Sequence, residues 1–334
     1  MSELTHLNVD GSLNPSLVHP NAVRNCARDV AADATFVRIS TPDLERYAVR
    51  LARAGITRPK LDETAHFDGA ADDLALYIMT LNAINFGSGY FPWLDKDPGT
   101  SGYFTVAKRL KSFFESSQVA PNVLATMTTL HCAEILGQSA QHPIQSELMT
   151  LFASALRQLG SLLLNTYGGS ALTFIDRSNR SVVTLIRQIT VLPFYQDIAR
   201  YRGRRVPLLK RAQLLGADLA VALPTLKAAR FDDLRVLTLF ADNLIPHVLH
   251  QDGVLIWDQA LSKRVALGRT LTPGSLEEVE LRACSIHAVE LLSRELEGLG
   301  VPAAAWELDY WLWNRGQSKA MKAQPRPRIR TVAY

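Results

Sequence analysis

Apolar residues recur at helical spacing through most of this chain, and this periodicity constrains the fold more than any other feature of the sequence. The segment that begins at Thr41 is a clear example. Thr41-Pro42-Asp43 supplies an N-cap, a proline at the first helical position and an acidic first turn. Apolar side chains then repeat on one face until Gly55, so a helix is predicted between these points.

Similar patterns predict helices along the rest of the sequence. They lie at 71–86, 122–136, 144–164, 181–192, 207–223, 232–240, 276–299 and 303–315. No run alternates with the period of two that a strand requires, and no Asn-Gly or Asp-Gly hairpin separates apolar runs. We therefore predict an all-α fold.

The loops between these helices are too short or too apolar to be interdomain linkers. They lie at 87–103, 167–180, 201–206 and 268–274. We expect one domain over residues 1–334, a compact helical globule of two lobes, with the first ~30 residues as a candidate loose arm.

Composition limits the class of protein. The 334 residues are 47% apolar and 20% charged, which allows a large core, and the net charge is only +4. Basic residues are dense only at 200–211, which fits a compact phosphate site about as well as a DNA-binding surface, and a solvated basic face is the more common outcome for such a run. Three cysteines without C-x-x-C spacing, no signal sequence and no membrane span lead us to expect a cytoplasmic protein.

Several common motifs are absent from the sequence. There is no P-loop, no Gly-x-Gly-x-x-Gly, no His-Glu-x-x-His and no Gly-x-Ser-x-Gly. His247 and His250 stand three residues apart, but no third ligand lies nearby in sequence. Core or surface histidines are therefore favoured over a metal site, and we predict no metal.

Asp242 occupies the most informative stretch of the chain. It follows an apolar segment, and Pro246 stands four residues later, in the first turn of the next predicted helix. Asp242 can cap this helix and interact with the positive end of its dipole. Local pattern alone favours a plain helix cap over a functional carboxylate.

Lys210 and Arg211 lie near the N-terminal end of the apolar helix predicted at 207–223. Helix N-termini attract anions, so two cations there suggest a bound phosphate or a carboxylate partner. The alternative is that both side chains extend into solvent.

Two aromatic segments are candidates for binding a planar base. Asn85, Phe86 and Trp93 lie in or beside a glycine-containing loop, where rings can stack on a base, although aromatic residues are more often part of the core. In the second segment, 307–315, helical spacing suggests packing for most members, and Asp309 and Trp313 are ambiguous.

The order of several short motifs resembles that of the queuosine-salvage proteins, from about residue 33 to the C-terminus. These motifs are Asn85-Phe86, Tyr167-Gly-Gly-Ser170, Lys210-Arg211-Ala-Gln213, Phe240-Ala-Asp242, Pro246, Glu278-Val-Glu-Leu-Arg-Ala-Cys-Ser285, Glu290-Leu-Leu, Leu312-Trp313 and Arg330-Thr-Val-Ala-Tyr334. The chain departs from the family's usual residues at Asn243, Leu244 and His247.

This resemblance implies an all-α fold related to the helix-hairpin-helix DNA glycosylases. The implied reaction is hydrolysis of queuosine 5′-monophosphate to queuine and ribose 5-phosphate, without a cofactor. Asp242 then corresponds to the catalytic aspartate and Lys210 to the lysine of the preceding buried helix. Lys210, with Arg211 as a further candidate, would hold the 5′-phosphate or position Asp242, and Asp218 and Asp309 are candidates for the guanine-like edge of the base.

Two other functions remain open at this point. One is a DNA or RNA base glycosylase, which the implied ancestry allows but the modest charge disfavours. The other is a nucleotide-binding module without activity, suggested by the departures from the family pattern. We expect a mononucleotide as the binding partner, with no stable nucleic-acid complex and no membrane contact.

Overall fold

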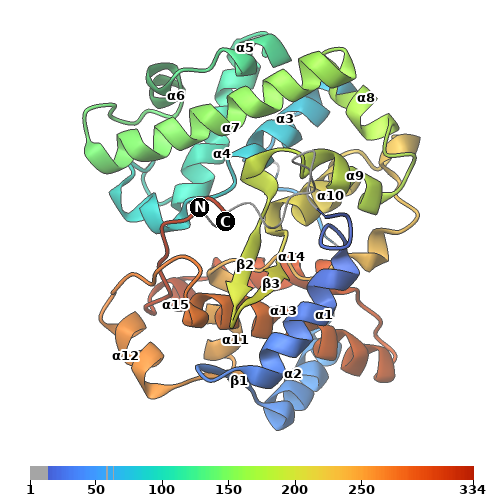
Figure 1. The fold of residues 1–334 in the computed structure, drawn as a ribbon, viewed down its shortest axis with the longest axis vertical. Helices are drawn as coiled ribbons and strands as arrows, with labels where there is room; N and C mark the ends of the chain where they lie inside the picture. Colours follow the sequence, from blue (N-terminus) through green and yellow to red (C-terminus); the bar gives the residue numbers. More distant parts are fainter. Residues whose placement is uncertain (1–13, 58, 63) are drawn as a thin grey trace. The chain divides into compact units, whose positions relative to one another are not determined.

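The computed structural model describes residues 14–57, 59–62 and 64–334, and helices dominate this part of the chain (Figure 1). It divides into two compact units, each assembled from separate stretches of sequence. The first unit takes residues up to 59 together with 196–213 and 235–330. The second unit takes 60–195, 214–234 and 331–334.

The first unit is organised around α13 (Leu276–Gly298). Four helices contact α13: α1 (Pro20–Asp33), α2 (Thr41–Ala54), α11 (Leu244–Gln251) and α14 (Ala305–Gly316). The side chain of Ser275 caps α13 by accepting a hydrogen bond from the Glu278 N–H. Side chains are buried on nearly every face of α13, as expected of a helix at the centre of a unit.

The fold is mostly helical, as predicted, but the first unit also contains two pairs of short antiparallel strands that the sequence patterns did not predict. β1 (Val37–Ile39) pairs with β4 (Leu255–Trp257), and β2 (Ile198–Tyr201) pairs with β3 (Arg204–Pro207). The β2–β3 turn has positive φ at both Arg202 (48°) and Gly203 (81°), as a tight hairpin turn requires. Arginine rarely takes the first of these positions, so the usual hairpin signal is missing from the sequence.

The second unit is built on α7 (Pro143–Tyr167), against which α3 (Ala71–Ala83), α5 (Pro121–Ala125) and α6 (Thr129–Ile135) pack (Figure 1). Gly160 allows α5 to approach the backbone of α7. A Cβ at this position would stand 2.4 Å from the Ala125 nitrogen and 2.5 Å from the Pro121 oxygen.

The remaining elements are shorter or peripheral. They are η1 (Ser88–Trp93), α4 (Gly102–Ser116), α8 (Ala171–Asp176), α9 (Val182–Ile189), η2 (Pro193–Tyr195), α10 (Lys210–Ala222), η3 (Lys227–Ala229), η4 (Leu234–Val236), α12 (Gln259–Ala266) and α15 (Lys319–Lys322). Residues 210–213 of α10 belong to the first unit and its remainder to the second.

Several predicted boundaries differ from the structure. The helix predicted at 122–136 is broken into α5 and α6, and the one predicted at 232–240 is absent apart from the single turn η4. Helix α1 lies within the stretch considered as a loose arm, whose residues 1–13 are outside the described residues. In the described part of the chain, no helix combines the length and apolar character needed to cross a membrane.

Candidate active-site segment

The residues that precede Asp242, from Leu237 to Ala241, form a buried segment outside helices and strands. A buried backbone outside helices and sheets needs other hydrogen-bond partners, because unpaired N–H and C=O groups are costly to bury. Here the partners are buried polar side chains on α10, α13 and α14. The position of this segment is therefore set by tertiary hydrogen bonds from residues distant in the sequence.

Gln213 on α10 holds the start of the segment. Its side chain is fully buried, and Oε1 accepts hydrogen bonds from the backbone N–H of Thr238 at 3.0 Å and from its hydroxyl at 3.1 Å. Gln213 Nε2 donates to the carbonyl of Leu208 at 3.1 Å. One amide thus connects the segment to the turn that leads into α10.

Asp309 on α14 holds the middle of the segment. It is 6% exposed, and its Oδ1 accepts a hydrogen bond from the Phe240 N–H at 3.0 Å. This contact gives Asp309 a structural task in addition to the predicted role at the base edge.

Asp242 stands at the end of the segment and is partly exposed. Its Oδ1 accepts hydrogen bonds from the N–H groups of Leu244 (2.7 Å) and Ile245 (3.0 Å), the first residues of α11. Asp242 therefore caps the helix from one position earlier than predicted, because α11 begins only after Asn243. Within the described residues, Oδ2 makes no hydrogen bond and the carboxylate makes no ion pair.

A basic residue missed by the sequence reasoning lies close to this carboxylate. Burial lowers the pKa of the half-buried Arg326 guanidinium, and attraction to the nearby Asp242 opposes that change. The chain beside Arg326 is fixed by a hydrogen bond from Asn243 Nδ2 to the Pro327 carbonyl, at 2.8 Å. The sequence signal for it was the alternation of basic residues in Arg326-Pro-Arg-Ile-Arg330, near the C-terminal end.

Lys210 and Arg211 open α10 and are both buried, at 6% and 1% exposure. The Lys210 N–H donates to Asp197 Oδ2 at 3.0 Å. The preceding residue, Leu209, has a φ of 50°, a left-handed conformation that a non-glycine residue adopts only when its surroundings enforce it. The N-terminus of α10 is therefore a constrained point of the backbone.

The other predicted binding residues are placed as follows. Phe86 is 2% exposed, and its contacts are those of a core residue. Its ring packs edge-on against Phe152, with 5.0 Å between the ring centroids, and stacks on Phe194, with 5.7 Å between the centroids. Asn85 and Asp218 are half-buried in the second unit.

The two predicted tryptophans are also half-buried. The carbonyl of Trp93 accepts a hydrogen bond from Gln145 Nε2 at 2.7 Å, and Trp313 lies on α14. Of the predicted residues, Lys210, Asp242 and Asp309 are thus tied to the polar framework of the first unit, whereas Asn85, Phe86, Trp93 and Asp218 belong to the second unit.

The two histidines considered for a metal have other partners. His247 is fully buried, with Nε2 at 3.1 Å from the Met321 carbonyl, and the ring of His250 stacks on Trp257 at 3.8 Å. In the ranges that the structure describes, no group of three or more His, Cys, Asp or Glu side chains is arranged to hold a metal ion.

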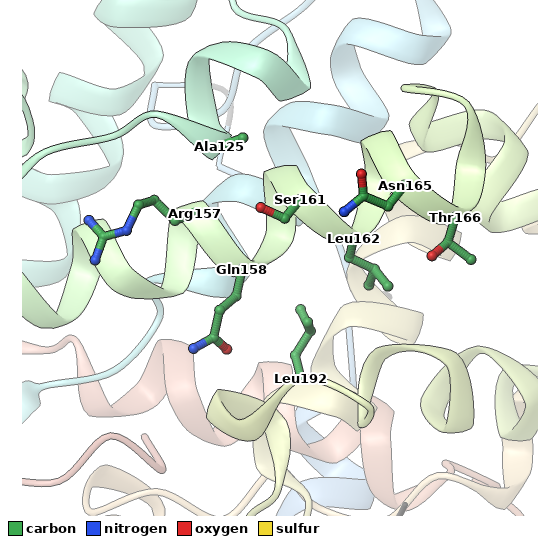
Figure 2. Close-up of a pocket in the computed structure, with 8 residues that line it drawn as sticks. All are labelled: Ala125, Arg157, Gln158, Ser161, Leu162, Asn165, Thr166 and Leu192. Atoms are coloured by element: carbon green, nitrogen blue, oxygen red, sulfur yellow. The ribbon is translucent and has the colours of Figure 1, made fainter. Parts of the chain in front are cut away.

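Two surface grooves lie apart from the predicted residues. Figure 2 shows a groove of about 530 Å³ in the second unit, where Gln158, Ser161 and Asn165 project from α7 and Leu192 lies opposite. A groove of about 610 Å³ in the first unit lies beside α1, β1, β4 and α13. Neither groove is lined by a residue predicted to bind substrate.

Comparison with known proteins gives matches along nearly the whole chain. The family model described as queuosine salvage protein matches residues 65–334. A protein from Sphaerobacter thermophilus named queuosine 5′-phosphate N-glycosylase/hydrolase is 34% identical over 318 residues, which cover 93% of this chain and 97% of the bacterial one. The protein of the same name from Mus musculus is 28% identical over 341 residues, covering 94% of this chain and 99% of its own.

Proposed function

The chain belongs to the queuosine salvage protein family, and from that premise we propose that it hydrolyses the N-glycosidic bond of queuosine 5′-phosphate. Two full-length relatives carry the name of this activity, and their similarity covers more than nine-tenths of each chain. The products are the free 7-deazaguanine base queuine and ribose 5-phosphate.

The observation that carries the proposal is the arrangement of Asp242. One oxygen of the carboxylate is anchored by two backbone N–H groups, and the other makes no hydrogen bond within the described residues. The side chain is partly exposed, although the segment before it is buried. A fixed carboxylate with one uncommitted oxygen suits a site where charge develops on a substrate.

The chemistry of the bond explains why a carboxylate is needed. As the bond between C1′ and the base nitrogen breaks, its electron pair leaves with the base and positive charge develops on the sugar. Asp242 stabilises this oxocarbenium-like state, and water then forms the new bond to C1′ while its proton passes to Asp242 or to solvent. A 7-deazaguanine has no N7 to protonate, so the departing base must gain its proton elsewhere.

The remaining assignments belong to the same proposal. Lys210 is the second catalytic residue, and Arg211 binds the 5′-phosphate, supported by two buried cations at the start of α10. Asn85, Phe86, Trp93, Asp218, Asp309 and Trp313 are proposed for the base side of the site. We also propose that the fold is related to that of the helix-hairpin-helix DNA glycosylases. This relation is supported by Asp242, which lies at the start of α11, and by Lys210 on the preceding helix α10.

Incubation with queuosine 5′-monophosphate tests the proposed function, with the free base and ribose 5-phosphate measured by chromatography. We expect both products in equal amounts. Parallel reactions use queuosine nucleoside, to show whether the phosphate is required, and a DNA duplex. Base release from the duplex would instead indicate a nucleic-acid glycosylase. Its duplex binding should then be tight and strongly salt-dependent, because log K falls by about 0.9 for each phosphate contact when the salt concentration rises tenfold.

A further inference from the structure

Arg282 on α13 makes a set of buried contacts that no sequence motif explained. The side chain is 2% exposed. Its Nε donates to the carbonyl of Ala241 at 3.0 Å, directly before Asp242. The two terminal nitrogens donate to both oxygens of Asp197, at 2.9 Å and 2.5 Å, and one of them lies 3.4 Å from Glu278 Oε1.

Asp197 extends these contacts to the start of α10. It is 8% exposed and lies just before β2. Oδ2 accepts from the Lys210 N–H at 3.0 Å as well as from Arg282. Its backbone carbonyl accepts from the N–H groups of Leu208 at 2.9 Å and Leu209 at 3.2 Å. Asp197 therefore fixes the left-handed turn that ends at Lys210.

We propose that Arg282 and Asp197 are positioning residues that set the place of Asp242 relative to Lys210. This inference rests on the proposed function of those two residues. The pair forms one continuous connection from the Ala241 carbonyl, through the guanidinium and the Asp197 carboxylate, to the Lys210 backbone. Neither positioning residue is assigned contact with the substrate.

Arginine suits this task for a geometrical reason. The planar guanidinium carries five N–H donors in a fixed fork, so it can bind a carboxylate with two parallel bonds and still donate from Nε in another direction. Lysine keeps the charge but lacks this fork. An Arg282→Lys substitution is therefore expected to preserve the buried charge and to lose either the Ala241 contact or the two-bond contact to Asp197.

The first experiment compares Arg282→Lys with Glu280→Gln, a matched control on the same helix. Glu280 is also fully buried, but its carboxylate accepts from the N–H groups of Thr35, Phe36 and Val37. Both variants are expected to melt at lower temperature. Assayed where both are folded, Arg282→Lys should lose about 10–100-fold in kcat with little change in KM, and the control should keep its kcat.

A second readout does not depend on activity. Deuterium exchange of peptides covering 243–250 reports on the two N–H groups that Asp242 caps. We expect faster exchange there in Arg282→Lys and not in Glu280→Gln. Unchanged exchange together with normal kcat in folded Arg282→Lys would overturn the positioning role.

Asp197→Asn provides the second variant if Arg282→Lys does not fold, because asparagine can still accept from the Lys210 N–H. It is combined with Asp242→Asn in a double-mutant cycle. If Asp197 acts through Asp242, the double variant should turn over no more slowly than Asp242→Asn alone, whereas additive losses contradict the proposal. An active Asp242→Asn protein would refute the proposed catalytic role of Asp242, and the exchange experiment would still test the positioning.

Discussion

Two buried regions of this protein are held together in different ways. The segment 237–241 lies outside helices and strands, and polar groups of its backbone are bound by side chains of Gln213, Asp309 and Arg282. The cluster around Phe86 is held by ring packing with Phe152 and Phe194. The first region depends on the identity of each partner, whereas the second depends on volume and contact. The first arrangement can therefore fix the position of Asp242, the functional group that follows the segment.

Phe86→Ala should have the largest effect on stability. A buried phenylalanine reduced to alanine leaves a cavity, so the free energy of unfolding should fall by about 3–5 kcal/mol. Denaturant unfolding measures this loss, and steady-state kinetics below the melting temperature measure KM. If the ring also contacts the base, as proposed, KM should rise together with the loss of stability, whereas unchanged stability would show that the core contacts of this cluster have been misinterpreted.

Gln213→Leu and Asn82→Leu sharpen the comparison, because both replace a buried amide by an apolar side chain of similar size. Gln213 has partners for both amide atoms, so its loss leaves the Thr238 N–H and the Leu208 carbonyl unpaired, at a cost of about 1–3 kcal/mol each. Asn82 is 2% exposed, and neither amide atom has a partner in the part of the chain described.

We therefore expect the two leucine variants to change stability in opposite directions. Asn82→Leu should leave the free energy of unfolding unchanged or raise it, while Gln213→Leu lowers it. Parallel urea titrations test the difference in sign. Equal losses in both variants would mean that the buried amides of Gln213 and Asn82 contribute to stability in the same way.

The smallest expected effect concerns His247, a buried residue of α11 that follows Asp242 by five positions. Burial, assisted by the nearby Arg326, lowers the pKa of His247 below its usual 6.5. The unfolded chain therefore takes up a proton first as the pH falls below about 6.5, so the stability of the folded state decreases from there down through the lower folded pKa. The contribution of the neutral buried ring to the free energy of unfolding is fully present above the usual pKa of about 6.5.

His247→Gln should accordingly flatten the dependence of stability on pH between about pH 5 and pH 7. Melting temperatures across that range measure the slope, and measurements at pH 8 serve as the control, since the ring is neutral in both states there. An identical slope in the variant and the parent would contradict the assignment.

Local patterns predicted much of this fold but could not predict the polar framework. The apolar residues of 237–240 resemble a helix when considered alone, yet their backbone is bound by Gln213 and Asp309, 25 and 69 positions away along the chain, and is not helical. The capping contacts of Asp242 could be predicted because a helix cap is a local feature, and its catalytic role stays a proposal. Arg282 lies within the segment 278–285, but its contacts to Asp197, 85 positions away, follow only from the tertiary fold.

The central claim is that Asp242 performs chemistry in addition to capping α11, and Asp242→Asn separates the two tasks. Asparagine caps helices about as well as aspartate, so the variant should melt near the parent temperature. It lacks the charge that stabilises the sugar cation and cannot accept the water proton, so kcat for queuosine 5′-monophosphate should fall by roughly 10²–10⁴-fold. A variant that melts normally and keeps more than about a tenth of the parent kcat would contradict the account.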